Sequence, residues 1–372
     1  MRIEKQGFIF DVEETKTEKK VCTFTGLFKH SNGRIFAGFR IGTKKDSTDG
    51  NGVVAEFINE TEWKILFSDF ETVFEGRKGD IKAVELFERK NQGISAILSW
   101  FDCSKGSKLY NSSSDTILPG KLILVDSPDM GKTWQNYRVI DTQSLPGPAL
   151  TGPIIRISAG YLAFFETYGP EKNGGPSYHA ARVLFSKDGS DFTEIKTVAR
   201  DPDDLLYFWD QRNSFDPGSQ IIISMFWTYD RKKEKDSDIH IAYGDIRKLN
   251  WSFPSSTGIR GQIAAPIPVS GTELLCFYVH RHYPGSMRLI KSEDRGKTWR
   301  FSEELVVYQN PERKEKGVSG ESSYAEYWED MNTWSFGHPA GILLDNNRVL
   351  LAYYAGKEAS LLSARYSIVS VH

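Results

Sequence analysis

The sequence predicts an all-β protein built from repeated four-stranded units. Its apolar runs are short, rich in β-branched and aromatic residues, and separated by Gly, Asp, Asn or Ser. Many of them come in pairs, in which a buried strand is followed by a more polar one, a pattern typical of successive antiparallel hairpins. Helical periodicity is almost absent, and the best candidate is one short helix over 322–331 behind a serine cap.

The expected strands are the runs in which this β pattern is clearest. Each lasts about as long as a normal strand, and a turn-forming residue lies beside most of them. In chain order they are 34–40, 93–101, 121–127, 160–168, 220–229, 273–281, 287–292, 348–356 and 361–371.

A recurring turn sets the size of the unit. SPDMGKTW (127–134) and SEDRGKTW (292–299) are near copies, and SKDGSDF (186–192) is a shorter one that ends in Phe. YGDIRKLNW (243–251) and FINETEW (57–63) look like eroded copies. The final aromatic residues are 71, 58, 59 and 48 residues apart, and 372 divided by six is 62. Five marked units and an unmarked last one therefore predict six units of four strands.

Each intact turn has a physical explanation. Ser and Asp accept hydrogen bonds from backbone N–H groups, and Gly adopts the positive φ that the turn needs. Trp is expected to pack back between neighbouring sheets. The motif therefore predicts a scaffold element without a part in catalysis.

These turns resemble the Asp-box (BNR) repeat of the sialidase-like β-propellers, and the resemblance covers most of the chain. Further segments resemble an uncharacterised glycosyl-hydrolase-like branch of that superfamily: WDQR (209–212), MFWTYDR (225–231), GIRGQIAAPIP (258–268), YVHRHYPGSMR (278–288) and FGHPAGILLDNNRVLLAYYA (336–355). The resemblance implies one domain over residues 1–372, a six-bladed β-propeller of four-stranded antiparallel sheets. Its site would lie in the central funnel, where the inner strands of all blades meet.

Composition narrows the choice of partners. The aromatic content of 13% suits sugar stacking, and a net charge of −2 argues against a nucleic-acid partner. Three widely spaced cysteines predict neither a disulfide framework nor a metal site. The sequence has no phosphate loop, nucleophile elbow or redox motif, so we expect a carbohydrate substrate and no cofactor. The first residues have no apolar core of a signal peptide and no run has membrane-span length, so we expect no membrane partner and, by default, a cytoplasmic location.

The segment 39–50 is the first candidate site. It resembles the sialidase segment in which an Arg leads into a loop that carries the catalytic Asp, and the matching residues are Arg40 and Asp46. A carboxylic acid above the funnel could protonate a glycosidic oxygen or activate water. The alternative is a solvated polar loop.

The segment 207–215 is the second candidate. Trp209 offers a stacking surface, and Asp210 falls near the position at which sialidases carry the Glu that activates their Tyr nucleophile. Arg212 would bind substrate or, in the structural alternative, form a salt bridge with Asp210.

Further candidate substrate ligands lie at later strand ends, where a polar cluster is more typical of a site than of a core. Reserve carboxylates are Glu166 and Glu326. The candidate ligands are Asp230, Gln262, His280, Arg281, Arg288 and His338.

The chain departs from the sialidase pattern at three places. A Thr stands where the Arg of the opening strand should be, within 20–28. The fourth-blade Arg falls on Tyr229 or Asp230, and the Tyr before the last blade is replaced by Phe336 or a neighbour. An Asp in place of an Arg would repel an anionic sugar. These departures predict altered sugar specificity.

Three functions remain open at this point. The first is an exo-acting glycoside hydrolase with Asp46 and Asp210 as its carboxylates. The second is a uronate lyase that uses His280, Arg281, Tyr229 and His338. The third is a glycan-binding propeller without catalysis. We rank them in this order.

Overall fold

The computed structural model describes residues 1–372 except 91–92, 105, 107–108, 112–115, 170–176 and 311–330. The described residues are almost entirely strands and turns, with a single 3-10 turn, η1 (Phe301–Glu303). The helix predicted over 322–331 lies outside them apart from Met331, and so does Glu326. None of the helical structure in the described part is long and apolar enough to cross a bilayer.

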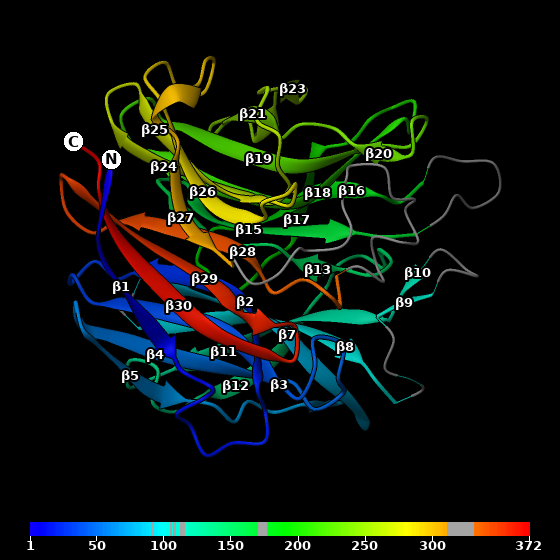
Figure 1. Ribbon diagram of the computed structural model, residues 1–372. Helices are drawn as coiled ribbons and strands as arrows, with labels where there is room; N and C mark the ends of the chain where they lie inside the picture. Colours follow the sequence, from blue (N-terminus) through cyan, green and yellow to red (C-terminus); the bar gives the residue numbers. More distant parts are fainter. Residues whose placement is uncertain (91–92, 105, 107–108, 112–115, 170–176, 311–330) are drawn as a thin grey trace.

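The main strands form six antiparallel groups of four, which we call blades 1 to 6 (Figure 1). The first, innermost strands are β2 (Val21–Lys29), β7 (Arg77–Glu88), β13 (Ala149–Leu150) with β14 (Ile155–Ile157), β18 (Leu206–Asp216), β24 (Ala264–Ser270) and β28 (Phe336–Leu343). The second strands are β3 (Ile35–Gly42), β8 (Ile94–Asp102), β15 (Gly160–Thr167), β19 (Ile221–Asp230), β25 (Glu273–His280) and β29 (Arg348–Glu358). The third strands are β4 (Asn51–Asn59), β11 (Gly120–Ser127), β16 (Ala180–Ser186), β21 (His240–Asp245), β26 (Ser286–Ser292) and β30 (Leu361–Ser370). The fourth strands are β5 (Glu62–Phe67), β12 (Gln135–Ile140), β17 (Glu194–Ala199), β22 (Asn250–Trp251), β27 (Leu305–Gln309) and β1 (Arg2–Phe10).

Short strands extend this pattern. β6 (Val73–Phe74) pairs with β7, β20 (Lys235–Asp236) pairs with β19, and β23 (Ser255–Ser256) pairs with β21. β9 (Tyr110–Asn111) and β10 (Thr116–Ile117) pair with each other.

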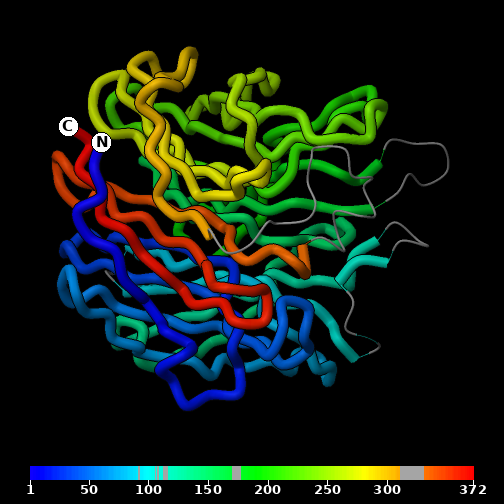
Figure 2. The backbone as a smooth tube through the Cα atoms, in the orientation of Figure 1, coloured from blue at the N-terminus to red at the C-terminus, as the bar shows by residue number. Residues whose placement is uncertain are grey.

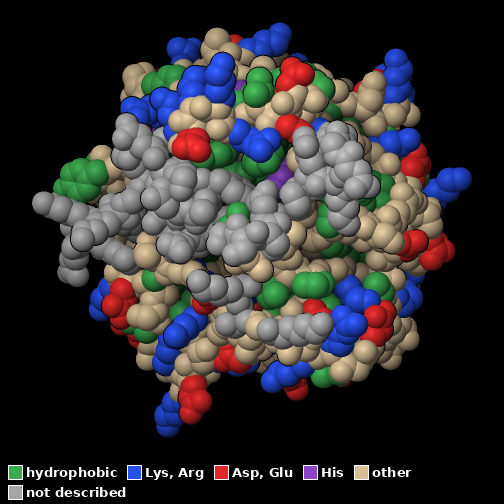
Figure 3. Space-filling view, turned by 90° about the vertical axis from the view of Figure 1, so that its right-hand side faces the viewer, with side chains coloured by type: hydrophobic (Ala, Val, Ile, Leu, Met, Phe, Trp, Pro, Cys, Tyr) green, Lys and Arg blue, Asp and Glu red, His purple; other side chains and the backbone are tan. Residues whose placement is uncertain are grey.

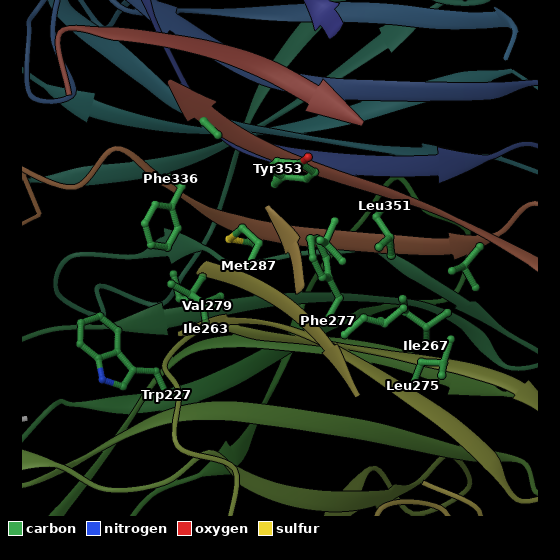
Figure 4. Packing of buried hydrophobic residues seen from close by; sticks show 14 of the residues in the cluster. Trp227, Ile263, Ile267, Leu275, Phe277, Val279, Met287, Phe336, Leu351 and Tyr353 are labelled. Carbon is green, nitrogen blue, oxygen red and sulfur yellow. The ribbon is translucent and has the colours of Figure 1, made fainter. Parts of the chain in front are cut away.

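The ring is closed by the two ends of the chain. β1 pairs with β30 along almost its whole length and so completes blade 6, and the termini lie side by side in Figure 2. Hydrophobic clusters fill the interfaces between consecutive blades, including the one between blades 6 and 1. Figure 4 shows the largest cluster, in which Trp227, Phe277, Phe336 and Tyr353 come from blades 4, 5 and 6. Because every blade buries both faces against neighbours, stability is spread around the ring.

The five recurring turns all connect the third strand of a blade to its fourth. In the best-formed one, Ser127 Oγ accepts a hydrogen bond from Gly131 N at 2.7 Å, and Asp129 accepts from Thr133 N at 2.8 Å. Gly131 has a φ of +90°, as predicted for this position. Trp134 packs against Phe70 in the connection between β5 and β6, with 5.2 Å between ring centroids. The turns are therefore scaffold, and the face that carries them is called the turn face.

The opposite face carries the ends of β15, β19 and β25 and the beginnings of β18 and β28. It lies at the right of Figure 1, beside β9, β10 and β20, and we call it the funnel face. Figure 3 looks onto it: hydrophobic side chains show near the middle between the grey residues, and charged side chains lie mostly toward the rim.

Candidate functional site

A pocket of about 110 Å³ opens on the funnel face. All blades except blade 5 contribute to its walls. The residues that line it are Phe24, Lys82, Ala83, Ser99, Phe101, Leu109, Ile117, Ala149, Leu150, Thr151, Glu166, Tyr168, Trp209, Asp210, Trp227, Met331 and His338.

Four of these side chains reach the pocket through the same local device. The innermost strands β2, β7, β18 and β28 each carry a register shift against their second strand. One residue of each bulge lines the pocket: Phe24, Lys82, Asp210 and His338. Three of them have positive φ values of 54°, 47° and 51°, at Phe24, Asp210 and His338. A bulge changes the direction in which a side chain points. A positive φ in a residue other than glycine costs about 1–3 kcal/mol, and residues strained in this way cluster at functional sites, where the strain can serve the function.

Glu166 and Asp210 form a pair of carboxyl groups on the pocket wall, of which Glu166 is buried and Asp210 has 22% of its side chain exposed. Glu166 ends β15, and its Oε1 accepts a hydrogen bond from Gln211 N at 2.8 Å. Its Oε2 accepts one from the Tyr168 hydroxyl at 2.5 Å. Burial first, and then the negative charge of Asp210, raise the pKa of Glu166 to about 8. Burial also raises the pKa of Asp210, against the effect of Arg212. Two like charges cannot easily coexist here, so the pair favours one proton held on Glu166.

Arg212 holds both Asp210 and His338. One guanidinium nitrogen lies 3.1 Å from Asp210 Oδ1 and 2.7 Å from His338 Nδ1, and another donates to the Thr151 carbonyl. Because Arg only donates, Nδ1 of His338 accepts and its Nε2 carries the proton. Burial and the cation of Arg212 lower the pKa of His338 well below its usual range. The imidazole is therefore neutral and offers one N–H donor.

Lys82 is a cation of the pocket wall. Its Nζ forms an ion pair with Asp80 and donates to the Lys45 carbonyl at 3.1 Å. Burial, followed by the nearby Arg40, lowers the pKa of Lys82, and Asp80 opposes this effect. The charge of Lys82 is thus largely compensated within the protein.

Aromatic rings form one side of the pocket. Trp209 stacks on Tyr229 with 5.2 Å between centroids and meets Trp227 edge-on at 5.3 Å. Rings of this kind bind the C–H face of a sugar while neighbouring polar groups bind its hydroxyls. The arrangement can bind a small polar ligand with one apolar face and place it beside the two carboxyls.

Several solved structures with a similar fold are glycosidases. A protein of unknown function from Dyadobacter fermentans matches with 16% identity over 100% of this chain and 99% of its own, at a TM-score of 0.70. A Hadza microbial sialidase matches with 12% identity over 98% of this chain and 68% of its own, at 0.66. The GH93 α-L-arabinofuranosidase of Fusarium graminearum, solved with arabinobiose, matches with 11% identity over 99% and 98%, at 0.64. The chain has the sialidase-like β-propeller fold. No protein-family model and no curated protein sequence matches it.

Within this sialidase-like fold, the structure separates the two carboxylates that the sequence analysis put together. Asp46 lines a different, open pocket at the rim, with Lys44, Asn332 and Glu358. Its nearest described partner is Asn332, at 3.4 Å. Asp210, in contrast, lies on the wall of the funnel pocket. Glu166, a reserve carboxylate in the sequence analysis, lines the same pocket as Asp210.

Arg40 also differs from its predicted role. Its side chain is fully buried between blades 1 and 2, where the guanidinium lies 3.2 Å from both oxygens of Asp80. It also donates to the carbonyls of Lys44 and Ser47. The Arg40 side chain points from β3 into the interface between the blades and binds the 43–50 loop. It does not line the pocket.

The predicted ligands on blade 5 lie beyond the pocket wall. Arg281 is buried under Trp334, 4.0 Å from the ring centroid, and donates to Gln262 Oε1 at 3.2 Å. Arg288, on β26, forms an ion pair with Glu304 at 2.7 Å. None of the predicted ligands Gln262, His280, Arg281 and Arg288 lines the pocket.

His280 and Asp230 lie at strand ends on the funnel face, outside the pocket. Burial, Arg288 and His282 together lower the pKa of His280 to about 4. Burial would raise the pKa of Asp230, but hydrogen bonds and charge from Lys233 outweigh it and lower that pKa.

Several pocket residues are not among the predicted site residues. Lys82, Thr151 and Tyr168 lie in segments without a recognised motif, and Trp227 lies in the quoted run 225–231 but was not singled out. One signal was available for Tyr168: it follows Glu166 by two residues at the end of a predicted strand.

Proposed function

We propose that the protein is a glycoside hydrolase that acts on an uncharged terminal sugar in the funnel pocket. The observation that carries the proposal is the pair of Glu166 and Asp210 on the pocket wall, in which the buried Glu166 carboxyl favours its proton and the Asp210 carboxyl lies beside an arginine. Glycoside hydrolysis needs one acid and one ionised carboxylate on either side of the bond that is cleaved.

In this proposal Glu166 is the general acid. Its raised pKa keeps it protonated near neutral pH, so it can give its proton to the glycosidic oxygen as the bond to the anomeric carbon breaks. Tyr168 and the backbone N–H of Gln211 hold the carboxyl in place. The leaving alcohol departs with that proton.

Asp210 is the second carboxylate. Arg212 favours its ionised form, so it can attack the anomeric carbon or take a proton from an attacking water. Either route consumes one water and releases a sugar and an alcohol. The anomer first formed tells the two apart, because attack by Asp210 retains the configuration and direct attack by water inverts it.

The charges around the pocket favour a neutral sugar. Each of the four arginines that the sequence analysis singled out already contacts protein groups: Arg40 binds Asp80, Arg212 binds Asp210, Arg281 binds Gln262, and Arg288 binds Glu304. A sugar carboxylate would also approach Asp210 at close range. The small volume of the pocket favours a terminal ring over the interior of a long chain.

The lyase hypothesis receives less support from the arrangement. It required His280, Arg281, Tyr229 and His338 to act together, and of these only His338 lines the pocket. His338 is moreover held through Nδ1 by Arg212.

The test is hydrolysis of p-nitrophenyl glycosides of neutral pentoses and hexoses, with the corresponding sialoside and a uronide beside them. We expect release of nitrophenol from at least one neutral glycoside and none from the sialoside. Glu166→Gln and Asp210→Asn should each lower kcat/KM by at least 100-fold. Asp46→Asn is the matched control and should stay within twofold of the parent.

Two results would contradict the proposal. Loss of activity in Asp46→Asn, with Glu166→Gln and Asp210→Asn unaffected, would return the chemistry to the rim. Binding of a neutral sugar without any turnover would identify a glycan-binding propeller.

A further inference from the structure

A chain of hydrogen-bonded polar groups runs from the funnel pocket into blade 5; Gln262 and Arg281 are buried and Asp236 is half-buried. It starts at Trp227, whose indole N–H donates to Asp236 Oδ1 at 2.6 Å. The other oxygen, Oδ2, accepts from Gln262 Nε2 at 3.0 Å. Gln262 Oε1 in turn accepts from Arg281 Nε at 3.2 Å. The four groups come from β19, β20, the segment before β24 and the end of β25.

The far end of the chain is fixed by aromatic packing. The guanidinium carbon of Arg281 lies 4.0 Å from the ring centroid of Trp334 and 4.5 Å from that of Phe336. Phe336 begins β28, which carries His338 two residues later. In Figure 4, Trp227 lies at the edge of the cluster that contains Phe336 and Val279. The chain therefore links the aromatic wall of the pocket to the strand that delivers the pocket histidine.

The polarity of the chain is determined at both ends. The Trp227 indole and the Arg281 guanidinium can only donate, so each must meet an acceptor. Gln262 presents its oxygen to Arg281, which leaves its NH₂ facing Asp236. The residue at 236 must then accept on both sides, as a carboxylate does and an amide does not.

We propose that Asp236, Gln262 and Arg281 are positioning residues that hold the Trp227 indole as the sugar-stacking surface of the pocket and thereby set substrate affinity. This inference rests on the proposed function, because it takes a neutral sugar ring with one apolar face as the ligand. The three residues act through Trp227, and neither Glu166 nor Asp210 contacts them through a described hydrogen bond.

A reversal of the chain tests this idea. Asp236→Asn alone puts an amide NH₂ against the Gln262 NH₂, and a flip of Gln262 would move the same conflict to Arg281. Gln262→Glu alone places two carboxylates together. The double variant D236N/Q262E restores a consistent order: indole N–H to the Asn oxygen, Asn NH₂ to the Glu carboxylate, and Arg281 to that carboxylate.

The first measurement is KM and kcat on whichever neutral p-nitrophenyl glycoside the parent hydrolyses. We expect D236N and Q262E each to raise KM about tenfold, with kcat within threefold, and D236N/Q262E to return KM to within threefold of the parent. Trp227→Phe keeps an aromatic ring but lacks the N–H, so it should match the single variants. Asn59→Asp, in the exposed turn before β5, is the control for a carboxamide exchange and should change neither constant.

The second measurement does not depend on turnover. The ¹⁵N-indole resonance of Trp227 is identified by its loss in Trp227→Phe, and its exchange with solvent is then followed by NMR. We expect slow exchange in the parent and in D236N/Q262E, and fast exchange in D236N. If the parent hydrolyses no neutral glycoside but the indole follows this pattern, the proposed function fails and the positioning chain stands.

The positioning role is refuted by either of two results. One is a Trp227 indole whose exchange is the same in the parent and in D236N. The other is a double variant that regains thermal stability but keeps the raised KM, since that outcome makes the chain purely structural. Where a single variant does not fold, Trp227→Phe and the double variant carry the same comparison.

Discussion

Replacement of Glu166 by Gln should change how the stability of the protein depends on pH. Gln has the shape of the protonated acid: its oxygen can accept from Gln211 N as Oε1 does, and its NH₂ takes the place of Oε2, so the Tyr168 hydroxyl, which donates to Glu166, has to turn and accept. It cannot titrate. Any difference in pH dependence between parent and variant therefore reports the proton on Glu166.

The sign follows from the raised pKa. The ordinary value for this carboxyl is 4.5, and in the folded protein burial and Asp210 raise it to about 8. Between these values the folded state holds a proton that the unfolded state has lost, so the contribution of Glu166 to stability is complete below about pH 4.5 and is lost as pH rises toward about 8. A full proton difference corresponds to about 1.4 kcal/mol per pH unit. Since Glu166 is only 1% exposed, solvent screening reduces this slope little.

The assay is urea unfolding of the parent and of Glu166→Gln at steps between pH 5 and pH 8. Burial also raises the pKa of Glu85, to about 7, and this residue lies in the central channel below the pocket. Glu85 is present in both proteins, so its contribution cancels when the two free energies of unfolding are subtracted. As pH rises, we expect the stability of the variant relative to the parent to increase by about 1 kcal/mol per pH unit. If the free energy of unfolding depends on pH in the same way in both proteins, Glu166 does not hold the proton. Glu85→Gln is the control for a buried carboxyl outside the pocket, and its turnover should be unchanged.

Three further predictions test other parts of the molecule. Arg212→Lys removes the forked contact to Asp210 and His338, so we expect kcat/KM to fall more than tenfold and the acid limb of its pH profile to move upward, as measured by initial rates from pH 4 to 8. Trp299→Ala empties a buried site on the turn face and should destabilise the protein by about 3–5 kcal/mol in urea unfolding, while the KM of the folded fraction stays unchanged. Burial lowers the pKa of His280 to about 4, so the parent should lose stability as pH falls from 6.5 toward 4, and His280→Gln should lose less when both are followed by thermal unfolding.

The fold could be predicted because its signals are local. A turn such as 127–134 depends on hydrogen bonds within a few residues, and each copy marks one blade whatever the rest of the chain does. The closure of the ring, unlike the turns, depends on residues that are far apart in the sequence. β1 pairs with β30 across almost the entire sequence, and nothing near Arg2–Phe10 indicates that partner. The sequence therefore predicts how many blades there are and leaves open where the last one takes its fourth strand.

The site was harder to predict because its residues meet across blades. Asp210 was singled out from an unusual run of four residues, whereas its partner Glu166 ends an ordinary strand of the preceding blade. Arg40 has the expected residue type in the expected order, but its side chain enters the interface with Asp80. Residue type and order do not tell which face of a blade a side chain lies on. That face decides whether an arginine can bind substrate or forms an ion pair inside the protein.

The bulges explain why strand alternation misleads in this part of the protein. A regular strand sends consecutive side chains to opposite faces, so an innermost strand could offer the funnel only every second residue. The register shifts at Phe24, Lys82, Asp210 and His338 break that rule at one level of the ring. Phe24, Asp210 and His338 also have positive φ values, which cost free energy that packing elsewhere in the protein has to balance. The local sequence shows neither the bulge nor this backbone conformation, so strand alternation alone could not have selected the residues of the pocket wall.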